Sequence, residues 1–342
     1  IIKENIYLIE QDLNVTFKEV ILILDNFNYS VFNISGFKKL NGAQLNLENV
    51  TYILNSLKST IHDQEKNKSF IHIFNSNYLL DKKKVENLPI GLFGELYSHE
   101  LTFFLIYNNE YKNLENIFSN CSLRIKKILF KSFIEGVDLI DTNHELHTFF
   151  KISIKENISE LIFFENSALK FVQNFNFGTS IIVNDIVKIL SIKKDTIEKF
   201  LFKNVLDNTA NAEDHLEKEY FDNGNFRKIK KKLIYDIASA RIQELAEIIK
   251  YKNVNLKSFF KTDSPIFLQV DKDNVLNCFK HSFFNSFSQN QGFKVKLFKK
   301  SSEKSYFYNA FKVVHFGWKK EAVPVIQTKK SLIARFFDLL FS

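Results

Sequence analysis

The sequence of 342 residues contains no methionine, and it has only nine glycines, three prolines and two cysteines. The cysteines, Cys121 and Cys278, lie far apart without a CxxC pair, so they give no disulfide framework or metal site and are typical of a reducing compartment. No run of 18 apolar residues occurs, so no membrane-spanning helix is predicted. No signal peptide is visible. Because the chain starts at Ile1 without an initiator, we interpret it as a fragment whose true N-terminus was cut off.

Phenylalanine and positive charge are in excess. The 38 phenylalanines, together with abundant Ile, Lys and Asn, are interpreted as a codon bias of an AT-rich genome rather than as a functional signal. The net charge of +8 favours acidic partners, which are nucleic acid, anionic lipid or an acidic peptide. No RNP motif, zinc-finger spacing or arginine-rich arm is present, so no nucleic-acid partner is predicted. The remaining lysines are expected to form a solvated surface.

Apolar patterns of period 2 and period 3.6 alternate along the chain. Strands are expected at 20–24, 69–74, 100–106, 125–130, 146–154, 160–164, 265–270 and 294–298. Helices are expected at 47–60, 110–120, 133–141, 178–190, 192–202, 227–250 and 275–287. Strands interleaved with helices indicate an α/β fold, in a chain long enough for two or more domains.

The last residues form an amphipathic pattern. On a helical wheel one continuous arc is apolar, and two lysines precede it after a linker at 321–328. A short Phe- and Leu-rich helix with flanking cations is typical of binding in the lipid interface. The alternative is that this helix docks on the protein's own core. The residues expected to bind the membrane are Lys329, Lys330, Leu332, Ile333, Phe336, Phe337, Leu340 and Phe341.

Several short motifs occur in a fixed order. Tyr-Leu-Leu-Asp at 78–81 is followed by Asn-Leu-Pro-Ile-Gly-Leu-Phe-Gly at 87–94. Upstream lie Phe32-Asn33 and Gly36; downstream lie Gly178 with Ile-Val-Asn-Asp-Ile at 182–186, then Ile237, Arg241, Glu244 and Leu245, then Tyr308 to Gly317. In this order the motifs resemble the FtsA family of actin-like bacterial cell-division proteins, in which Phe32, Asn33 and Gly36 would form a turn.

The resemblance implies an α/β, actin-like (ASKHA) two-lobed fold with an inserted SHS2-type subdomain 1C. By this resemblance the first hairpin of subdomain 1A would precede Ile1, so it is expected to be missing from this sequence. The implied domains are subdomain 1A at 1–19 and 108–148, subdomain 1C at 20–107, subdomain 2A at 149–191 and 257–320, subdomain 2B at 192–256, and a linker with the C-terminal membrane helix at 321–342.

The phosphate loops that this family uses are degenerate here. Such loops need glycine because the backbone must approach the phosphates closely. The family's Asp-Ile-Gly-Gly-Gly-Thr-Thr-Asp corresponds to 153–160, with no glycine and with Ser153, Lys155, Glu156, Asn157 and Glu160 in its place. The adenosine loop falls on 269–273, also without glycine. We therefore expect no cofactor, with ATP possible but disfavoured; the alternative is that Lys155 or Lys272 restores phosphate contact.

The resemblance implies a non-catalytic tether that links FtsZ filaments to the inner membrane. It would lie on the cytoplasmic face of that membrane, at the division septum. No enzymatic activity is expected. Arg241, Glu244 and Leu245 would bind the C-terminal peptide of FtsZ, an acidic partner suited to the basic run at 227–232. An anionic membrane surface, later division proteins bound through subdomain 1C and possible self-association are further implied partners. The alternatives are an ATP-binding FtsA filament with ATPase activity and an actin-like adaptor of type IV pilus assembly.

Overall fold

The computed structural model describes residues 1–203, 214–221, 226–256, 259, 264–288, 294–298 and 302–322. The chain divides into two compact units. Unit 1 comprises residues 1–22, 28–128 and the described part of 316–342, and unit 2 comprises residues 23–27 and the described part of 129–315.

The described residues of unit 1 form three helices, a four-stranded sheet and most of a two-stranded one. The four-stranded sheet has the order β2-β5-β3-β4 and is antiparallel throughout, and β1 pairs with β6 in the two-stranded sheet. The last residues of β1 and β6 belong to unit 2. The elements are α1 (Ile2–Leu13), β1 (Glu19–Leu24), β2 (Ser30–Lys39), α2 (Leu47–Gln64), β3 (Lys68–Leu80), β4 (Lys83–Val85), β5 (Leu96–Tyr107), α3 (Asn108–Ser119) and β6 (Arg124–Phe130).

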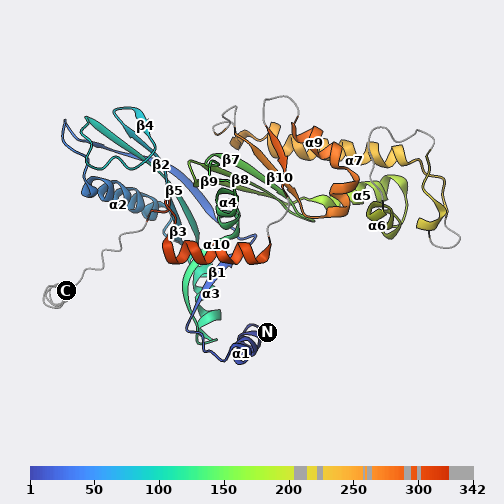
Figure 1. The fold of residues 1–342 in the computed structure, drawn as a ribbon, viewed down its shortest axis with the longest axis horizontal. Coiled ribbons are helices and arrows are strands. Elements are labelled where there is room, and N and C mark those ends of the chain that lie inside the picture. Colours follow the sequence, from blue (N-terminus) through green and yellow to red (C-terminus); the bar gives the residue numbers. More distant parts are fainter. Residues whose placement is uncertain are drawn as a thin grey trace. The chain divides into compact units, whose positions relative to one another are not determined.

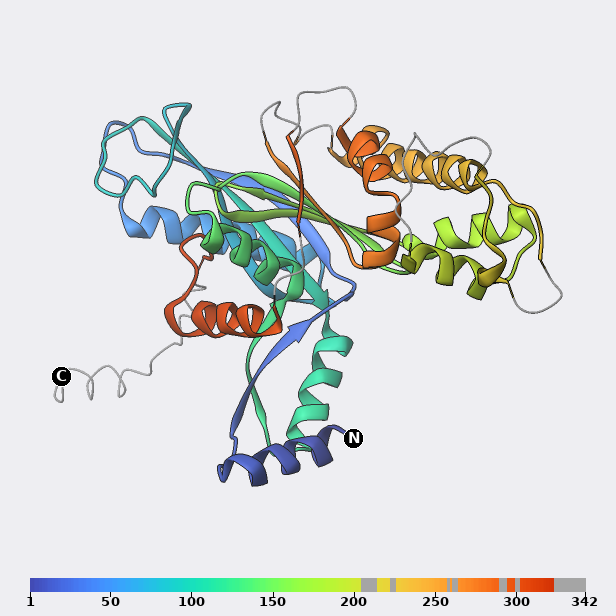
Figure 2. The same ribbon diagram turned by 45° about the vertical axis from the view of Figure 1, so that its right-hand side comes forward.

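The helix α2 covers one face of the four-stranded sheet, as Figures 1 and 2 both show. It begins where the side chain of Asn46 accepts a hydrogen bond of 2.9 Å from the amide of Asn49. A Cβ atom at Gly36 would lie 2.5 Å from the side chain of Ile53 on α2, so glycine permits this close approach. The expected turn at Phe32, Asn33 and Gly36 was wrong, because all three lie inside β2 and pair with β5.

After α10 (Glu303–Phe316) the chain returns to the sheet of unit 1. Glu321 forms a β-bridge with Phe74, and the amide of Ala322 donates to the carbonyl of Ile73 at 2.7 Å. The Glu321 carboxylate contacts Nδ1 of His72 at 2.8 Å and accepts from Nζ of Lys127 at 2.6 Å. Glu321 and Ala322 are therefore held against β3.

Unit 2 is built on a five-stranded sheet with helices on both faces. Its elements are α4 (Lys131–Thr142), β7 (Phe149–Ile154), β8 (Ser159–Glu165), β9 (Ala168–Phe175), α5 (Thr179–Leu190), α6 (Lys194–Lys203), η1 (Lys218–Tyr220), α7 (Lys231–Ala246), the π-helical turn η2 (Glu247–Tyr251), η3 (Val254–Leu256), β10 (Ile266–Val270), α8 (Asp273–Cys278), α9 (Lys280–Ser288), β11 (Val295–Leu297) and α10 (Glu303–Phe316, of which Phe316 falls in unit 1).

The strand order of this sheet defines the fold class. The order is β11-β10-β7-β8-β9, with β8 antiparallel to its neighbours and β10 parallel to both β7 and β11. Counted from β7, this is the order 3-2-1-4-5 with only the second strand reversed, which is the order of a lobe of the actin-like fold. The predicted actin-like α/β fold class is confirmed.

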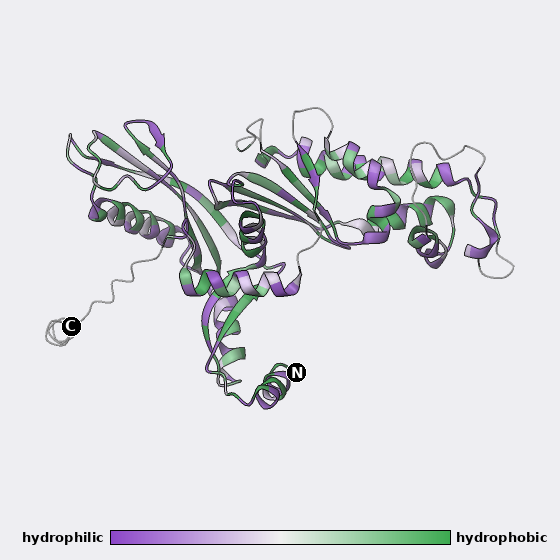
Figure 3. Cartoon of the chain, viewed as in Figure 1, coloured by the Kyte–Doolittle hydropathy of each residue, from purple (hydrophilic) through white to green (hydrophobic). Residues whose placement is uncertain are grey.

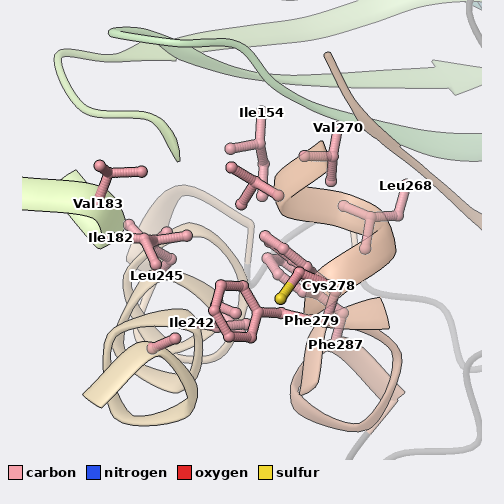
Figure 4. Packing of buried hydrophobic residues seen from close by; sticks show 14 of the residues in the cluster. Ile154, Ile182, Val183, Ile242, Leu245, Leu268, Val270, Cys278, Phe279 and Phe287 are labelled. Atoms are coloured by element: carbon pink, nitrogen blue, oxygen red, sulfur yellow. The ribbon is translucent and has the colours of Figure 1, made fainter. Parts of the chain in front are cut away.

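The core of unit 2 lies between this sheet and the helices α5, α7 and α9. Alternate residues of β7, which are Phe150, Ile152 and Ile154, point into it, and the hydrophobic colour dominates the strands in Figure 3. Figure 4 shows Ile154, Leu268 and Val270 of the strands facing side chains of the helices. The side chain of Lys151 has the opposite direction in β7, toward α4 on the other face of the sheet.

The predicted subdomain boundaries and the SHS2 identity of subdomain 1C stay predictions. The two compact units divide the chain near residues 22, 27, 128 and 315, which are not the predicted boundaries. The helix expected at 275–287 is two helices, α8 and α9, which meet at Phe279.

Candidate functional site

The hairpin β7–β8 lies where the degenerate phosphate loop was predicted. Ser153 is the residue before the end of β7 and is paired with Glu160 of β8. The turn between the strands is closed by a hydrogen bond of 2.9 Å from the amide of Lys155 to the carbonyl of Ile158. The turn is formed without glycine, and each residue of it carries a side chain.

Lys155 is engaged by the end of β1. Its Nζ donates to Oδ1 of Asp25 at 2.9 Å and to Oδ1 of Asn26 at 3.2 Å. Burial acts to lower the pKa of Lys155, but the hydrogen bond to Asp25 and the negative charge of Glu160 outweigh it, so the pKa is raised. A lysine held as a cation by carboxylates of its own chain is compensated without an external anion.

Lys272, the other lysine considered for phosphate contact, is also paired. Its Nζ lies 2.7 Å from Oε1 of Glu156. This hydrogen bond and the charge of Lys272 lower the pKa of Glu156. Glu156 therefore stays ionised in the turn, where it repels a phosphate and attracts the lysine.

The N-terminus of α5 meets the same turn. The first backbone amides of a helix are a general anion-binding site. Here the amide of Thr179 donates to the carbonyl of Lys155 at 2.9 Å, and the amide of Ser180 donates to the carbonyl of Glu156 at 2.8 Å. A Cβ atom at Gly178 would lie 2.1 Å from the Lys155 carbonyl oxygen, so glycine allows this contact. These two amides are used by the turn itself.

Further charged side chains of β7, β8 and α4 lie next to the turn. Lys151, which is 1% exposed, forms an ion pair with Glu135 of α4 and donates to the hydroxyl of Ser153 at 2.8 Å. Burial and the nearby charge of Glu135 raise the pKa of Glu160 to about 7, against the charges of Lys151 and Lys155. Lys131 of α4 binds the other oxygen of Asp25 at 2.6 Å.

The charged residues that lie next to the turn were missed by the sequence analysis. Asp25, Glu135 and Lys151 each come from a different element, and more than 100 residues separate Asp25 from its two lysines. The one available signal was Lys151, a charged residue within the apolar strand of residues 149–154. Such a residue is usually paired when it is buried.

The second glycine-free segment, 269–273, connects β10 with α8. The side-chain amide of Gln269 donates to Asp271 at 2.6 Å, and the amide of Asp271 donates to the carbonyl of Ile154 at 3.0 Å. This segment is therefore adjacent to the end of β7, where the β7–β8 turn begins.

The predicted partner-binding residues lie on α7. Arg241 forms ion pairs with Asp185 of α5 and with Glu244 one turn along its own helix. Leu245 is 2% exposed and belongs to the core of unit 2, so no partner reaches its side chain without rearrangement. Arg241 and Glu244 are partly accessible, and their role in peptide binding stays a prediction.

The predicted membrane-binding residues, from Lys329 to Phe341, lie outside the described residues. Among residues 1–322, in the parts that the structure describes, no helix is long and apolar enough to cross a membrane. In the same parts no group of three or more His, Cys, Asp or Glu side chains is arranged to hold a metal ion.

Comparisons with known proteins show likeness only at the level of structure. No protein-family model and no curated protein matches the sequence. A structure titled as the PilM–PilN type IV pilus biogenesis complex is 10% identical, with a TM-score of 0.48 over 93% of this chain and 83% of that chain.

Two further structures match a smaller part. The ethanolamine utilization protein EutJ from Carboxydothermus hydrogenoformans is 11% identical, with a TM-score of 0.36 over 56% of this chain and 57% of that one. MreB5 of Spiroplasma citri bound to AMPPNP is 15% identical, with a TM-score of 0.38 over 62% and 65%. These neighbours have actin-like folds, and at such identities none of their activities transfers to this chain.

Proposed function

We propose that this chain is a non-catalytic membrane tether and recruitment scaffold of the FtsA type, which links FtsZ filaments to the inner membrane at the division septum. The observation that carries the proposal is the β7–β8 turn. It has no glycine, its lysines are paired with carboxylates of the same chain, and it occupies the first amides of α5. These residues do not fit the phosphates of a nucleotide.

A membrane tether needs no bound nucleotide. Linking two modest affinities, one for a lipid surface and one for a filament, raises the overall affinity through effective concentration. The carboxylate of Glu156 in the turn repels a phosphate. A nucleotide phosphate bound to Lys272 would also have to break the ion pair between Lys272 and Glu156. The turn thus favours the nucleotide-free scaffold over an ATP-dependent filament.

Isothermal titration of the full chain with Mg-ATP is the direct test. No heat of binding is expected at micromolar nucleotide. A dissociation constant below about 10 μM would refute the nucleotide-free proposal and favour the ATP-dependent alternative.

Membrane binding is tested by flotation with vesicles that contain anionic lipid. Deletion of residues 329–342 and the double variant Phe336→Ala, Phe337→Ala are expected to abolish flotation, because they remove apolar area and, in the deletion, the two lysines. The matched control is Ser331→Ala with Ser342→Ala, on the polar arc of the same wheel, which should float as the parent does. Equal flotation of all variants would contradict the tether.

Filament binding is tested with the C-terminal peptide of FtsZ. Arg241→Glu is expected to weaken the affinity about tenfold, because it reverses the charge that faces an acidic peptide. The matched control is Lys280→Glu, an exposed position on α9 outside the basic run at 227–232. Arg241→Gln serves as a milder variant, because Asp185 and Glu244 lose their partner in the reversal. Binding to a pilus-assembly peptide instead of FtsZ would favour the adaptor alternative.

A further inference from the structure

One end of the four-stranded sheet of unit 1 exposes apolar side chains. At this end β2 stops, β5 begins and β3 turns into β4, near the label β4 in Figure 1. We call this end, residues 38–48 and 81–95, the tip. Its exposed apolar residues, which are 47% to 68% accessible, are Leu47, Ile90, Leu92 and Phe93. A single exposed apolar residue is ordinary, but a cluster of them marks an interaction surface.

Hydrogen bonds hold the two loops of the tip side by side. The amide of Leu45 donates to the carbonyl of Leu92 at 2.9 Å, and the amide of Gly91 donates to the carbonyl of Leu45 at 2.8 Å. The amide of Leu92 also donates to the carbonyl of Pro89 at 3.2 Å, which closes a turn in which Gly91 has the positive φ of 85° that a type II turn requires. The apolar side chains are therefore carried by a backbone that is hydrogen-bonded before any partner arrives, so little ordering is needed on binding.

Lysines outnumber carboxylates in and beside the tip. The charged residues of the tip are Lys38, Lys39, Glu48, Asp81, Lys82, Lys83, Lys84, Glu86 and Glu95. Two more lysines lie next to it, because Nζ of Lys320 donates to the carbonyl of Glu86 at 3.0 Å, and because burial, followed by the charges of Lys319 and Lys84, lowers the pKa of Lys320. Seven lysines thus accompany four carboxylates, and this excess is the same whichever of them are paired within the chain. A positive excess favours an anionic partner.

Exposed apolar side chains together with lysines suit the interface of an anionic bilayer. The apolar groups enter the boundary of the acyl chains, and the long lysine side chains keep their ammonium groups among the headgroups. The choice of lipid rather than a protein as the partner rests on the proposed tether. The predicted membrane-binding residues 329–342 follow Ala322, which is held on β3 of the same unit.

We propose that the tip of unit 1 is a second membrane-binding surface, which inserts Leu92 and Phe93 into an anionic bilayer. Two contacts on one protein make the second binding step intramolecular, so the overall affinity exceeds that of either contact. One loop binds weakly by itself, so flotation of the chain still depends on residues 329–342. The two contacts share no residue.

Insertion is measured with a tryptophan placed in the tip. Phe93→Trp is made in the full chain, which is titrated with vesicles of phosphatidylcholine and phosphatidylglycerol whose acyl chains carry bromine, a quencher of tryptophan at short range. Trp318, the single native tryptophan, is present in every variant, and the parent gives its contribution. The matched control is Tyr107→Trp, an exposed position at the opposite end of β5. After subtraction of the parent, quenching at the tip is expected to exceed that of the control at least about threefold.

The outcomes distinguish the tip from the tether. No quenching of Phe93→Trp beyond the parent, at any lipid concentration, would overturn the tip proposal. If deletion of residues 329–342 leaves flotation unchanged while Phe93→Trp is quenched, the tether fails and the tip stands. An emission of Phe93→Trp that depends on protein concentration without lipid would show that a second copy covers the tip, and would also overturn the proposal.

Serine variants test the apolar side chains. Leu92→Ser with Phe93→Ser is expected to weaken vesicle binding of the full chain about tenfold, because both lose their apolar contact with lipid. The matched control is Leu8→Ser with Leu13→Ser, two exposed apolar positions on α1. Equal affinities of the two double variants would contradict insertion of the tip.

Neutral variants test the lysines. Lys39→Gln with Lys83→Gln is expected to weaken binding to the anionic vesicles about fivefold, and to have no effect with pure phosphatidylcholine. The matched control is Lys66→Gln with Lys112→Gln, which removes the same charge at exposed positions outside the tip. The same loss in both double variants would mean that only the net charge of the protein matters, and would contradict a defined surface at the tip.

Discussion

Two buried polar clusters, one in each unit, differ in whether their polar atoms have hydrogen-bond partners. In unit 2 the buried lysine Lys151 has the carboxylate of Glu135 and the hydroxyl of Ser153 as partners. In unit 1 His99 and Tyr97 are 1% and 0% exposed, yet the hydroxyl of Tyr97 and both ring nitrogens of His99 have no hydrogen-bond partner among the described residues. Both lie on the sheet face that α2 covers, next to Tyr78.

A buried polar group with a partner and one without a partner affect the free energy of unfolding differently when they are removed. A buried ion pair contributes little net stability, but removal of one partner leaves a charge in a poor solvent. A buried neutral group without a partner has already lost its hydration, so its removal relieves the folded state. A polar-to-apolar substitution is therefore expected to change the free energy of unfolding with one sign at Lys151 and with the opposite sign at His99 or Tyr97.

The largest effect is expected for Lys151→Met. It leaves Glu135 without its partner, and we expect the free energy of unfolding of unit 2 to fall by about 3–5 kcal/mol. Urea denaturation followed by circular dichroism measures the change. The double variant Lys151→Met, Glu135→Gln is the control, because it removes both charges and should recover most of the loss. A single variant as stable as the parent would show that the pair is not effectively buried.

The second prediction uses pH to distinguish the units. Burial, with a contribution from Lys320, lowers the pKa of His99 to about 4, below its ordinary value of 6.5. The unfolded chain then binds the proton first, so unit 1 loses stability as the pH falls from 6.5 toward 4. The pKa of Glu160 is raised to about 7 from 4.5, so unit 2 loses stability as the pH rises from 4.5 toward 7. Each trend amounts to about 2–3 kcal/mol between pH 4.5 and 6.5.

Two variants and two probes resolve these trends. The fluorescence of Trp318, the single tryptophan, follows unit 1, and hydrogen exchange in β7 and β8 follows unit 2. His99→Leu should remove the acid sensitivity of the first signal and leave the second unchanged. Glu160→Gln should do the reverse. Parallel pH trends in the two units of the parent protein would refute the distinction.

The sequence predicted the elements that carry a clear apolar period. The helix α2 was found close to its observed bounds because it buries one regular face, and the strands β7, β8 and β10 were found because they are short, mainly apolar runs that are buried throughout. The strand β2 was missed, because its alternating Asn, Ser, Gly and Lys residues are favourable in a turn and become a strand only by pairing with β5. The strand β4 was also missed, because a pattern of period 2 cannot be recognised in three residues.

The candidate site was predicted in part. The absence of glycine at 153–160 and 269–273 is a local property, so the sequence shows it directly. The partners of Lys155 and Lys151 are not local, because Asp25 and Glu135 reach them only after folding. The burial of Leu245 likewise depends on the packing of α7 against its neighbours, which the motif resemblance did not contain.

A smaller effect, with the opposite sign to that at Lys151, is expected for His99→Leu at pH 8. The histidine is neutral there, so the substitution removes two unsatisfied nitrogens without any change in charge. We expect unit 1 to gain about 1–2 kcal/mol in its free energy of unfolding, since desolvated polar atoms are lost and an apolar side chain of similar size remains. Urea denaturation followed by Trp318 fluorescence measures the gain. A loss of stability would mean that His99 has a bound water as its partner.

The smallest effect is expected for Tyr97→Phe, which removes one oxygen from the same face of the sheet. Burial and the neighbouring Tyr78 raise the pKa of Tyr97, so the hydroxyl is neutral throughout the accessible pH range. Because that hydroxyl has no hydrogen-bond partner in the described parts of the chain, we expect a gain of about 1 kcal/mol at every pH, in contrast to the pH-dependent effect at His99. Tyr52→Phe on the exposed side of α2, where the side chain is 58% exposed, is the matched control and should change nothing. If Tyr97→Phe instead lowers the stability by as much as Lys151→Met does, the hydroxyl of Tyr97 is a satisfied polar group, and the contrast between Tyr97 and Lys151 is lost.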